Sequence, residues 1–462
     1  MRELITANTL LRSRRLFRWL LVFNLLLSTA SLPAAASSPR KNRSVIVISL
    51  DGFPAYALDD PRLPIPTLRK LVHDGVIAAS MRPINPTVTW PNHTAIVTGV
   101  DASEHRVLFN GLLVRHDGAM PTIEPWRDKE QLVHAPTIYD IAYKAGLSTA
   151  QVDWVAIYGA KTITWQFPEL PDPNGKIERE LIDSGVVTSD QLRKFEDSSQ
   201  AWQDEMWTAA AVHIIEKHKP NLLLLHLLTL DDINHTYGPM TPASFSAIAF
   251  LDAKVKQVVD AVRRSHRLKR TTFIILSDHG FRAYKYKIRP DVLLREKGIL
   301  KEQGGQSKSD AWVMPEGGSA GLYITNRRRA DELLPQLRNI FAAAEGVAKI
   351  YGPDEFGELG YPLPRVTDQT PDLVLAAAPD YMFSAESEGN YVEPVAQGGT
   401  HGYINTDPQM QAIFIASGAD IQKGIRLGSI SNLEVAPTIA TILGLEMKNV
   451  TGHPIPGILK NK

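Results

Sequence analysis

Side chains that can bind a metal ion or act as a nucleophile stand in five short segments between residues 51 and 401. Carboxylate and imidazole groups are the ligands that Zn²⁺ and similar divalent ions take in proteins. A directly coordinated ion also lowers the pKa of a hydroxyl group, which then becomes a nucleophile. These residue types therefore predict a site with two metal ions for phosphoryl transfer, formed by Asp51, Thr89, Asp231, His235, Asp278, His279 and His401.

Two of these segments come directly after predicted β-strands. Asp51 follows the run Ser44–Leu50, and Asp278 with His279 follows the run Thr271–Leu276. In an open α/β sheet, ligand-binding groups gather beyond the carboxyl ends of the strands. A single aspartate in such a place most often begins a helix, but two strands that each end in a ligand-type residue favour a shared site.

Two further segments carry the remaining acid and imidazole groups. Asp231 and His235 are four positions apart, so in a helix both side chains project from one face and can bind one ion. The same spacing fits a pair on a solvated helix surface, and the neighbouring Asp232 competes for the ligand role. His401 stands among the glycines of the segment Gly398–Gly402, where the backbone can approach a site closely. An ordinary loop histidine is the alternative there.

The candidate nucleophile is Thr89, which lies between two prolines in largely apolar surroundings. A threonine hydroxyl loses its proton at neutral pH only with help from a metal ion or a base. Packing in a helix accounts for the nearby Thr94 and Thr98. The Asn92 amide has two interpretations: it donates to a phosphate oxygen, or it begins the helix expected over His93–Val97.

The elements that must position these residues alternate between buried strands and amphipathic helices. The run Ser44–Leu50 is rich in β-branched residues and shows no polar alternation, as in a strand covered on both faces. This alternation predicts an α/β fold with a parallel-rich sheet flanked by helices. Further strands are expected over Ser148–Val152, Asn221–Leu228 and Gln411–Ala416, and helices over Pro66–His73, Pro136–Ala145, Trp207–His218, Ala243–Arg264 and Leu433–Leu443.

Residues 283–395 differ from the rest in being richer in charge, glycine and proline. They contain strands of their own, expected over Gly321–Thr325 and Leu373–Ala377, and a helix over Ala330–Ala344. We therefore predict a smaller inserted α+β subdomain at 283–395, within a catalytic core formed by residues 37–282 and 396–462.

The N-terminal residues 1–36 have the three parts of a signal peptide, which predicts a periplasmic or secreted protein. A basic cluster precedes the apolar run Trp19–Leu27, and Ala34–Ala36 offers small residues for cleavage. The segment Ser13–Phe17 is similar to a twin-arginine export signal, so ordinary secretory and twin-arginine export both remain open, as does an uncleaved anchor. The apolar run is short for a membrane span, and we expect no stable membrane insertion after cleavage.

Composition excludes several classes of function. Lys and Arg together number 50, as do Asp and Glu, so net charge signals no nucleic-acid partner. A phosphate-bearing substrate would have to be met by metal ions. The sequence has no cysteine, which removes thiol nucleophiles, iron–sulfur clusters and disulfides.

Taken in order, these motifs resemble the nucleotide pyrophosphatase/phosphodiesterase branch of the alkaline phosphatase superfamily. The resemblance covers nearly all of residues 44–450 and implies an alkaline-phosphatase-like core. It also implies a small, nucleotide-like phosphate ester as substrate. The matching stretches are SLDGF (49–53), PTVTWPNHT (86–94), DDINHTYGP (231–239), LSDHGF (276–281) and THGY (400–403).

The resemblance also assigns roles to individual residues. It implies two zinc ions, one held by Asp51, Thr89, Asp278 and His279 and the other by Asp231, His235 and His401. Thr89 would be the nucleophile and Asn92 a donor to a phosphoryl oxygen. Between Asp231 and His235 the chain departs from the family pattern, and Trp90 stands where the family often has phenylalanine. Trp90 suits stacking on a nucleobase; Tyr158 is a candidate for the opposite wall, with ordinary packing as its alternative.

The predicted reaction is hydrolysis of a phosphodiester or phosphoanhydride bond through a covalent phospho-threonine. The alternative is a phosphomonoesterase or phosphonate hydrolase with the same site, which needs extra positive groups; Lys161, Arg282, Lys285 and Lys287 are the candidates. A metal-stabilised binding protein or a transferase is a third possibility. The sulfatase branch does not fit, because its nucleophile stands in a Cys/Ser-x-Pro-x-Arg setting that the segment around Thr89 lacks.

Overall fold

The fold is built around strand β1 (Ser44–Leu50), in which every residue is buried. β1 pairs in parallel with β7 (Leu222–Leu227) on one side and with β8 (Thr271–Leu276) on the other. A strand between two parallel neighbours is covered on both faces, which explains why its sequence shows no polar alternation. The computed structural model describes residues 38–117, 119–303 and 306–460, so the predicted signal peptide lies outside the described residues.

Eight strands form the main sheet, in the order β21-β2-β20-β8-β1-β7-β5-β6. Only β20 runs against its neighbours, because it is antiparallel to both β8 and β2. The predicted α/β class with a mostly parallel sheet is therefore confirmed, with one reversed strand. The other strands of this sheet are β2 (Gly75–Arg82), β5 (Thr149–Val152), β6 (Trp165–Phe167), β20 (Phe414–Gly418) and β21 (Ile425–Ser431).

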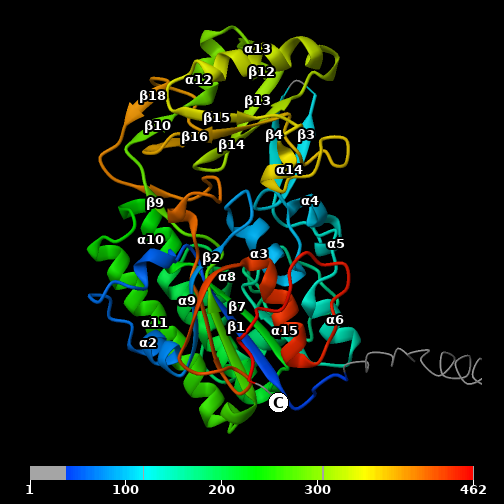
Figure 1. Cartoon of the computed structure of the whole chain (residues 1–462), viewed down its shortest axis with the longest axis vertical. Helices are drawn as coiled ribbons and strands as arrows, with labels where there is room; N and C mark the ends of the chain where they lie inside the picture. The colour runs from blue at the N-terminus through cyan, green and yellow to red at the C-terminus, as the bar shows by residue number, and fades with distance from the viewer. Residues whose placement is uncertain (1–37, 118, 304–305, 461–462) are drawn as a thin grey trace, which may run out of the picture. The chain divides into compact units, whose positions relative to one another are not determined.

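Helices cover both faces of this sheet (Figure 1). On one face Ile46, Ile48 and Leu50 of β1 belong to a hydrophobic cluster that includes α2 (Pro66–His73), α9 (Gln200–His213) and α11 (Pro242–Arg264). On the other face Val45 and Val47 belong to a cluster that includes α3 (Thr89–Thr98), α6 (Ile138–Lys144) and α15 (Val435–Leu443). The alternation of side chains along β1 thus supplies both layers of the core.

A second, smaller sheet has the strand order β13-β14-β16-β15 and is antiparallel throughout. Its strands are β13 (Ala311–Pro315), β14 (Ser319–Ile324), β15 (Val347–Tyr351) and β16 (Leu373–Ala377), and α13 (Ala330–Ala342) packs on it. These elements lie within the predicted insert and stand together in Figure 1. The hairpin of β3 (Leu112–His116) and β4 (Ala119–Glu124) contacts the same region although it comes from the predicted core. The boundaries of the insert stay a prediction.

The remaining described elements are short. Helix α10 (Thr229–Tyr237) follows β7, and the last residues of the helix predicted to end at His218 form a π-helical turn, η2 (Ile214–His218). No helix among the described residues has the length and apolar character needed to cross a membrane. The other helices are α4 (Ala102–His105), α5 (Lys129–Leu132), α7 (Lys176–Asp183), α8 (Ser189–Arg193), α12 (Pro290–Glu296) and α14 (Phe356–Leu359), and the other strands are β9 (Arg282–Ala283), β10 (Tyr286–Ile288), β11 (Leu300–Gln303), β12 (Gln306–Ser309), β17 (Tyr381–Phe383), β18 (Val392–Pro394) and β19 (Gly399–Thr400).

Candidate functional site

Three neighbouring strands deliver acid and imidazole groups to one end of the main sheet. Asp51 follows the last residue of β1, and Asp278 and His279 lie just beyond β8. β7, the other neighbour of β1, leads through Leu228 into α10, which carries Asp231 and His235 on one face. Because the three strands are parallel, their carboxyl ends meet at the same edge.

His401 reaches the site through a small two-stranded pairing. Thr400 of β19 lies opposite Arg282 of β9, directly after the segment that contains His279. The Thr87 carbonyl oxygen accepts hydrogen bonds from Gly402 N at 3.0 Å and faces His401 Nδ1, also at 3.0 Å. The loop before Thr89 and the loop that holds His401 are therefore tied together.

The described residues form two groups of metal-ligating type around one shared aspartate. Ligand atoms of Asp51, Asp231 and His279 lie within 4.8 Å of one another, and so do those of Asp231, His235 and His401. Within the second group, His235 Nε2 is 3.2 Å from Asp231 Oδ2 and His401 Nε2 is 3.9 Å from Asp231 Oδ1.

Of the two other candidate carboxylates, Asp278 lies beside these groups and Asp232 lies outside them. Asp278 Oδ2 lies 3.2 Å from His279 Nε2, which is 3.5 Å from Asp51 Oδ1. Asp232, the competing candidate, is exposed and belongs to neither group.

All three histidines of the site present the same ring nitrogen to it. Nδ1 of His279, His235 and His401 faces a backbone carbonyl oxygen, of Gly280 at 3.1 Å, Gly399 at 3.2 Å and Thr87 at 3.0 Å. A carbonyl oxygen can only accept, so Nδ1 carries the proton and a neutral ring keeps its lone pair on Nε2. This arrangement fixes ring orientation in the way that histidine ligands of metal ions require.

Four buried polar atoms of the site make no hydrogen bond to any described residue: Asp51 Oδ1, Asp231 Oδ1, Asp278 Oδ2 and His279 Nε2. Buried polar atoms are otherwise almost always paired. Burial and the charges of Asp278 and Asp231 raise the pKa of Asp51 well above its usual value. Burial lowers the pKa of His279 to about 4 and that of His401 to about 3, so both rings are neutral at pH 7. Clustered carboxylates and neutral imidazoles that lack partners are a donor set that fits divalent cations.

Thr89 is the first residue of α3 and is largely buried. Its carbonyl oxygen is 2.9 Å from His93 Nδ1, and the same nitrogen is 3.6 Å from Asp278 Oδ2, so Thr89 stands beside the Asp278 side of the site. His93 Nε2 lies 2.9 Å from Ser49 Oγ. Both nitrogens of His93 are thus engaged, which makes it a support for the start of α3.

Asn92 is fully buried, and every hydrogen-bonding position of its amide is used. Nδ2 donates to Pro86 O and Val88 O, both at 2.9 Å, while Oδ1 accepts from Ile84 N at 2.8 Å and Asn432 Nδ2 at 2.9 Å. Donation to a phosphoryl oxygen, as predicted, would require one of these bonds to break. These contacts instead hold the loop that leads into α3.

Two residues near the site, Asn110 and His226, were not predicted from the sequence, because neither belongs to one of the motifs. Asn110 Oδ1 accepts a hydrogen bond from Trp90 N at 3.0 Å, the Asn110 side chain is exposed, and its Nδ2 has no partner among the described residues. His226, inside β7, places Nε2 2.8 Å from Asp51 Oδ2 and Nδ1 3.2 Å from Asp153 Oδ2. Although burial opposes it, these two carboxylates raise the pKa of His226 well above its usual value. The His226 ring holds Asp51 Oδ2, so that Asp51 Oδ1 faces His279 Nε2.

A cavity of about 250 Å³ adjoins the start of α3 through Trp90. Trp90, next to Thr89, lines it together with Trp126, Trp154 and Tyr158. Tyr158 is 54% exposed, and its ring centroid is 6.4 Å from that of Trp126. The two aromatic residues predicted to bind substrate, Trp90 and Tyr158, therefore share one pocket.

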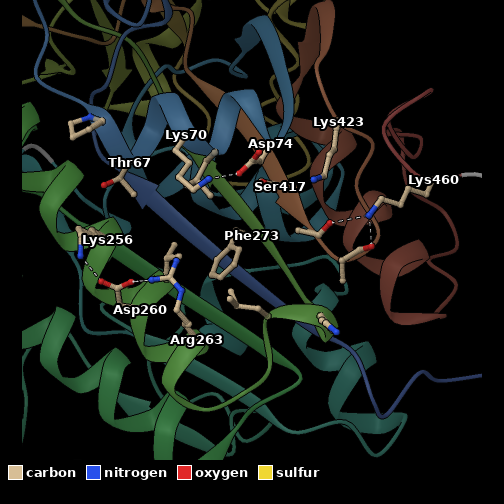
Figure 2. A pocket seen from close by; sticks show the side chains of 17 residues that line it. Thr67, Lys70, Asp74, Lys256, Asp260, Arg263, Phe273, Ser417, Lys423 and Lys460 are labelled. Carbon is tan, nitrogen blue, oxygen red and sulfur yellow. Dashed lines mark hydrogen bonds and ion pairs between the residues drawn. The ribbon is translucent and has the colours of Figure 1, made fainter.

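A larger cavity, of about 710 Å³, is lined by none of these residues (Figure 2). It lies at the other end of β8, where Phe273 forms part of it, and lysines dominate its charge. Part of that charge is paired, because Lys70 Nζ is 2.7 Å from Asp74 Oδ2 and Lys256 Nζ is 2.5 Å from Asp260 Oδ2.

The four basic residues proposed for a monoester pocket are placed differently. Arg282 pairs with Asp407 at 2.7 Å, Lys285 with Asp380 at 2.9 Å and Lys287 with Glu386 at 2.7 Å. Lys161 is exposed. None of the four lines the cavity beside Trp90.

Comparison with known proteins gives a consistent picture. Residues 45–404 match the model of the family described as type I phosphodiesterase / nucleotide pyrophosphatase. The chain is 25% identical over 437 residues to an uncharacterized pyrophosphatase/phosphodiesterase of Schizosaccharomyces pombe, covering 87% of this chain and 77% of that protein. It is 25% identical to human ectonucleotide pyrophosphatase/phosphodiesterase family member 1, covering 93% of this chain but only 43% of the relative.

Solved structures agree with the fold. Murine ectonucleotide pyrophosphatase/phosphodiesterase 5 superposes with a TM-score of 0.70 at 19% identity, covering 90% of this chain and 100% of that one. An inactive variant of the same murine protein, solved in complex with AMP, gives the same score. The alkaline-phosphatase-like fold is thereby established for the described residues.

Proposed function

The chain belongs to the type I phosphodiesterase / nucleotide pyrophosphatase family, hydrolases that act on phosphoester bonds, and from that premise we propose that it cleaves nucleotide-like phosphodiester or phosphoanhydride bonds with Thr89 as nucleophile. The observation that carries the proposal is the common orientation of His235, His279 and His401. Each ring turns Nε2 toward the clustered carboxylates of Asp51, Asp231 and Asp278, each of which has one buried oxygen without a hydrogen-bond partner among the described residues.

The side chains that would hold the metal ions fall into two sets. Asp51, Asp278, His279 and the Thr89 hydroxyl form one, and Asp231, His235 and His401 the other, in line with the second group of ligand atoms. Two divalent ions bound there, for which three imidazoles favour zinc, would neutralise phosphate charge and lower the pKa of the Thr89 hydroxyl. His226 holds Asp51 in place, and the Thr87, Gly280 and Gly399 carbonyls hold the rings.

Thr89 then performs the chemistry. Its oxygen attacks phosphorus, the bond to the leaving group breaks, and a phospho-threonine ester remains. Water attacks that ester and returns the hydroxyl. Thr89 begins α3, so the positive end of the helix dipole favours the phosphate group. Because the amide of Asn92 is fully engaged, we assign donation to a phosphoryl oxygen to Asn110 Nδ2.

The surroundings favour a diester over a monoester. The aromatic cavity beside Thr89 offers room and stacking surface for a nucleobase, between Trp90 and Tyr158. The extra negative charge of a monoester would need a free cation, but Arg282, Lys285 and Lys287 are each paired with an acid, and the exposed Lys161 does not line this cavity. AMP bound to an inactive murine relative supports a nucleotide substrate.

Kinetics on matched esters test this function. We expect the purified protein to hydrolyse bis(p-nitrophenyl) phosphate and thymidine p-nitrophenyl phosphate much faster than p-nitrophenyl phosphate, and to lose activity in a chelator.

Thr89→Ala should lower kcat by roughly 10³-fold or more while metal content stays unchanged. Thr98→Val, which removes a hydroxyl of the same helix bonded to Thr94 O, serves as the control and should keep its rate. Normal turnover by Thr89→Ala would refute the nucleophile, and release of product only with an acceptor alcohol would indicate a transferase.

We also propose that the protein works in the periplasm or outside the cell. Residues 1–36 have the pattern of an export signal, and several relatives are named as ectonucleotide enzymes. Fractionation of the producing cells with N-terminal sequencing tests this. We expect a mature N-terminus near Ser37 in the exported fraction, and an unprocessed cytoplasmic chain would contradict the proposal.

A further inference from the structure

A second cluster of ligand-type side chains lies outside the site already described. It joins Glu180 of α7 to His213, the last residue of α9, and His218, the last residue of η2. His213 Nε2 and His218 Nε2 are each 2.7 Å from Glu180 Oε2. Ligand atoms of the three side chains lie within 4.8 Å of one another, and the side chains are only 10–18% exposed.

The π-helical turn is what brings the two imidazoles together. In a regular α-helix, residues five apart point about 140° away from each other, because each residue turns the chain by about 100°. The wider turn of η2, whose hydrogen bonds span five residues, places positions 213 and 218 on one face. Turns of this kind are rare and are frequently found at functional sites.

Packing fixes one of the rings further. The His218 ring stacks on Trp165, with ring centroids 3.7 Å apart and planes inclined by 19°. Lys176 Nζ also lies over the Trp165 ring, 4.0 Å from the ring centre. A ring held in this way loses little conformational freedom when Nε2 binds a ligand.

We propose that Glu180, His213 and His218 form a binding site for a single divalent transition-metal ion of the zinc class. Two imidazoles and one carboxylate are the ligand set of mononuclear sites that leave a position open for water. The ion takes the place of the hydrogen bonds that both Nε2 atoms make to Glu180 Oε2, and each Nε2 gives up its proton on binding. Lys217 Nζ, 3.3 Å from the same oxygen, is 54% exposed and can move into solvent.

Occupancy of this site links α7 to the end of α9. Helix α7 contacts β6, the edge strand that begins at Trp165, and His218 stacks on Trp165 itself. Gln166 of β6, together with Pro168 and Glu169 just beyond it, lines the cavity beside Trp90. The ion therefore acts as a structural clamp behind one wall of that cavity, and its binding stabilises the folded chain increasingly as the free metal concentration rises above Kd.

Metal stoichiometry tests the site. Wild-type protein and the variant His213→Gln/His218→Gln are saturated with Zn²⁺, dialysed against zinc-free buffer, and analysed by inductively coupled plasma mass spectrometry. Glutamine can still donate to Glu180, so the hydrogen bonds survive while the ligands are lost. We expect the double variant to hold one zinc ion fewer per chain than wild type and to retain hydrolysis of bis(p-nitrophenyl) phosphate.

Controls separate loss of a site from loss of the fold. His453→Gln removes an exposed histidine outside the cluster and should leave the zinc content unchanged. Glu180→Gln should lose the same single ion, and it replaces the double variant if that one does not fold. Because the readout is a difference between variants of residues that belong to neither metal group of the catalytic site, it is independent of the proposed catalytic function. Equal zinc content in wild type, Glu180→Gln and the double variant would overturn the proposal and leave a hydrogen-bonded triad.

The charge of Lys217 gives a second, independent test. A positive group beside a bound dication weakens binding, so Lys217→Gln should tighten zinc affinity at this site by about threefold. The increase should be absent when the same substitution is made in the Glu180→Gln background. Affinity that is unchanged or weakened by Lys217→Gln would contradict a metal site at this position.

Discussion

Backbone carbonyl oxygens orient the three imidazole rings of the candidate metal centre. The ring of His401 faces Thr87 O and that of His235 faces Gly399 O, so each is fixed by a segment remote in sequence. The ligand types and their spacing were readable from single segments, but these contacts were not. The contacts of His226 could not be predicted from the sequence either. The available signal was that His226 is the one polar residue in the otherwise leucine-rich strand β7.

Asn92 is buried and Asn110 is exposed, so we expect substitution of these two asparagines to have different effects. Asn92→Ala removes four buried hydrogen bonds, and the partners left unpaired should lower the free energy of unfolding by about 2–4 kcal/mol. Asn110→Ala, at an exposed position, loses only the bond from Trp90 N and should lower the free energy of unfolding by about 0.5–1 kcal/mol, but it should lower kcat by roughly 10²-fold. Urea unfolding and steady-state kinetics on the two variants check this. The reverse pattern would return the donor role to Asn92.

At the scale of elements, α10 depends on a carboxylate from another helix. Asp204 of α9 is fully buried and accepts from Leu228 N and Thr229 N, both at 3.0 Å, at the start of α10. Sequence patterns identify caps that are adjacent to a helix, whereas Asp204 precedes Leu228 by 24 residues. The cap sets where α10 begins and hence where Asp231 and His235 lie.

Substitution of this cap should affect stability and metal binding together. Asp204→Asn loses one of two acceptors and should lower the free energy of unfolding by about 1–2 kcal/mol. It should also weaken zinc retention, because α10 carries ligands. Asp252→Asn is the matched control, since Asp252 accepts from Thr67 N and Leu68 N at the start of α2, which holds no site residue. Equal zinc retention by both variants would contradict the link between α10 and the metal site.

Sequence periodicity predicted some elements closely and others not at all. The strand Ser44–Leu50 and the helix Pro66–His73 have the predicted bounds, because one is uniformly apolar and the other begins with proline. Strand β2 (Gly75–Arg82) was missed, since glycine, alanine and serine interrupt its apolar pattern. The reversed direction of β20 was also missed, because it depends on pairing with β8 and β2 after a long intervening segment.

At the scale of the whole molecule, the smaller sheet and the segment around α3 share a hydrophobic cluster. Ala95 and Phe109 come from the first part of the chain, and Met314, Tyr323 and Phe356 come from the predicted insert. All five side chains are buried. The described residues from Pro39 onward accordingly form one compact unit, and we expect them to unfold together.

A buried histidine gives this unit a predictable response to acid. His105 accepts a hydrogen bond from Val107 N at Nδ1, and burial lowers its pKa to about 3. An unfolded chain has a histidine pKa of about 6.5, so below that pH the unfolded state binds a proton that the folded state refuses. Stability from this residue is therefore complete above about pH 6.5 and falls by up to about 1.4 kcal/mol per pH unit as pH drops toward 3.

Urea unfolding at several pH values measures this effect. The free energy of unfolding should fall less steeply between pH 6 and pH 4.5 in His105→Gln than in wild type. His453→Gln, which changes an exposed histidine, should keep the wild-type slope. If His105→Gln and wild type lose stability in parallel over this range, His105 is protonated in the folded state and the expectation is wrong.

The most direct test of the account is a crystal of the purified protein measured above and below the zinc absorption edge. Anomalous difference maps should show two peaks at the end of the main sheet, one beside Asp51, Asp278 and His279 and the other beside Asp231, His235 and His401. Nitrogen ligands should lie about 2.0–2.1 Å and oxygen ligands about 2.0–2.2 Å from the peaks. A zinc-saturated crystal with no anomalous density among these side chains would contradict the two-metal centre.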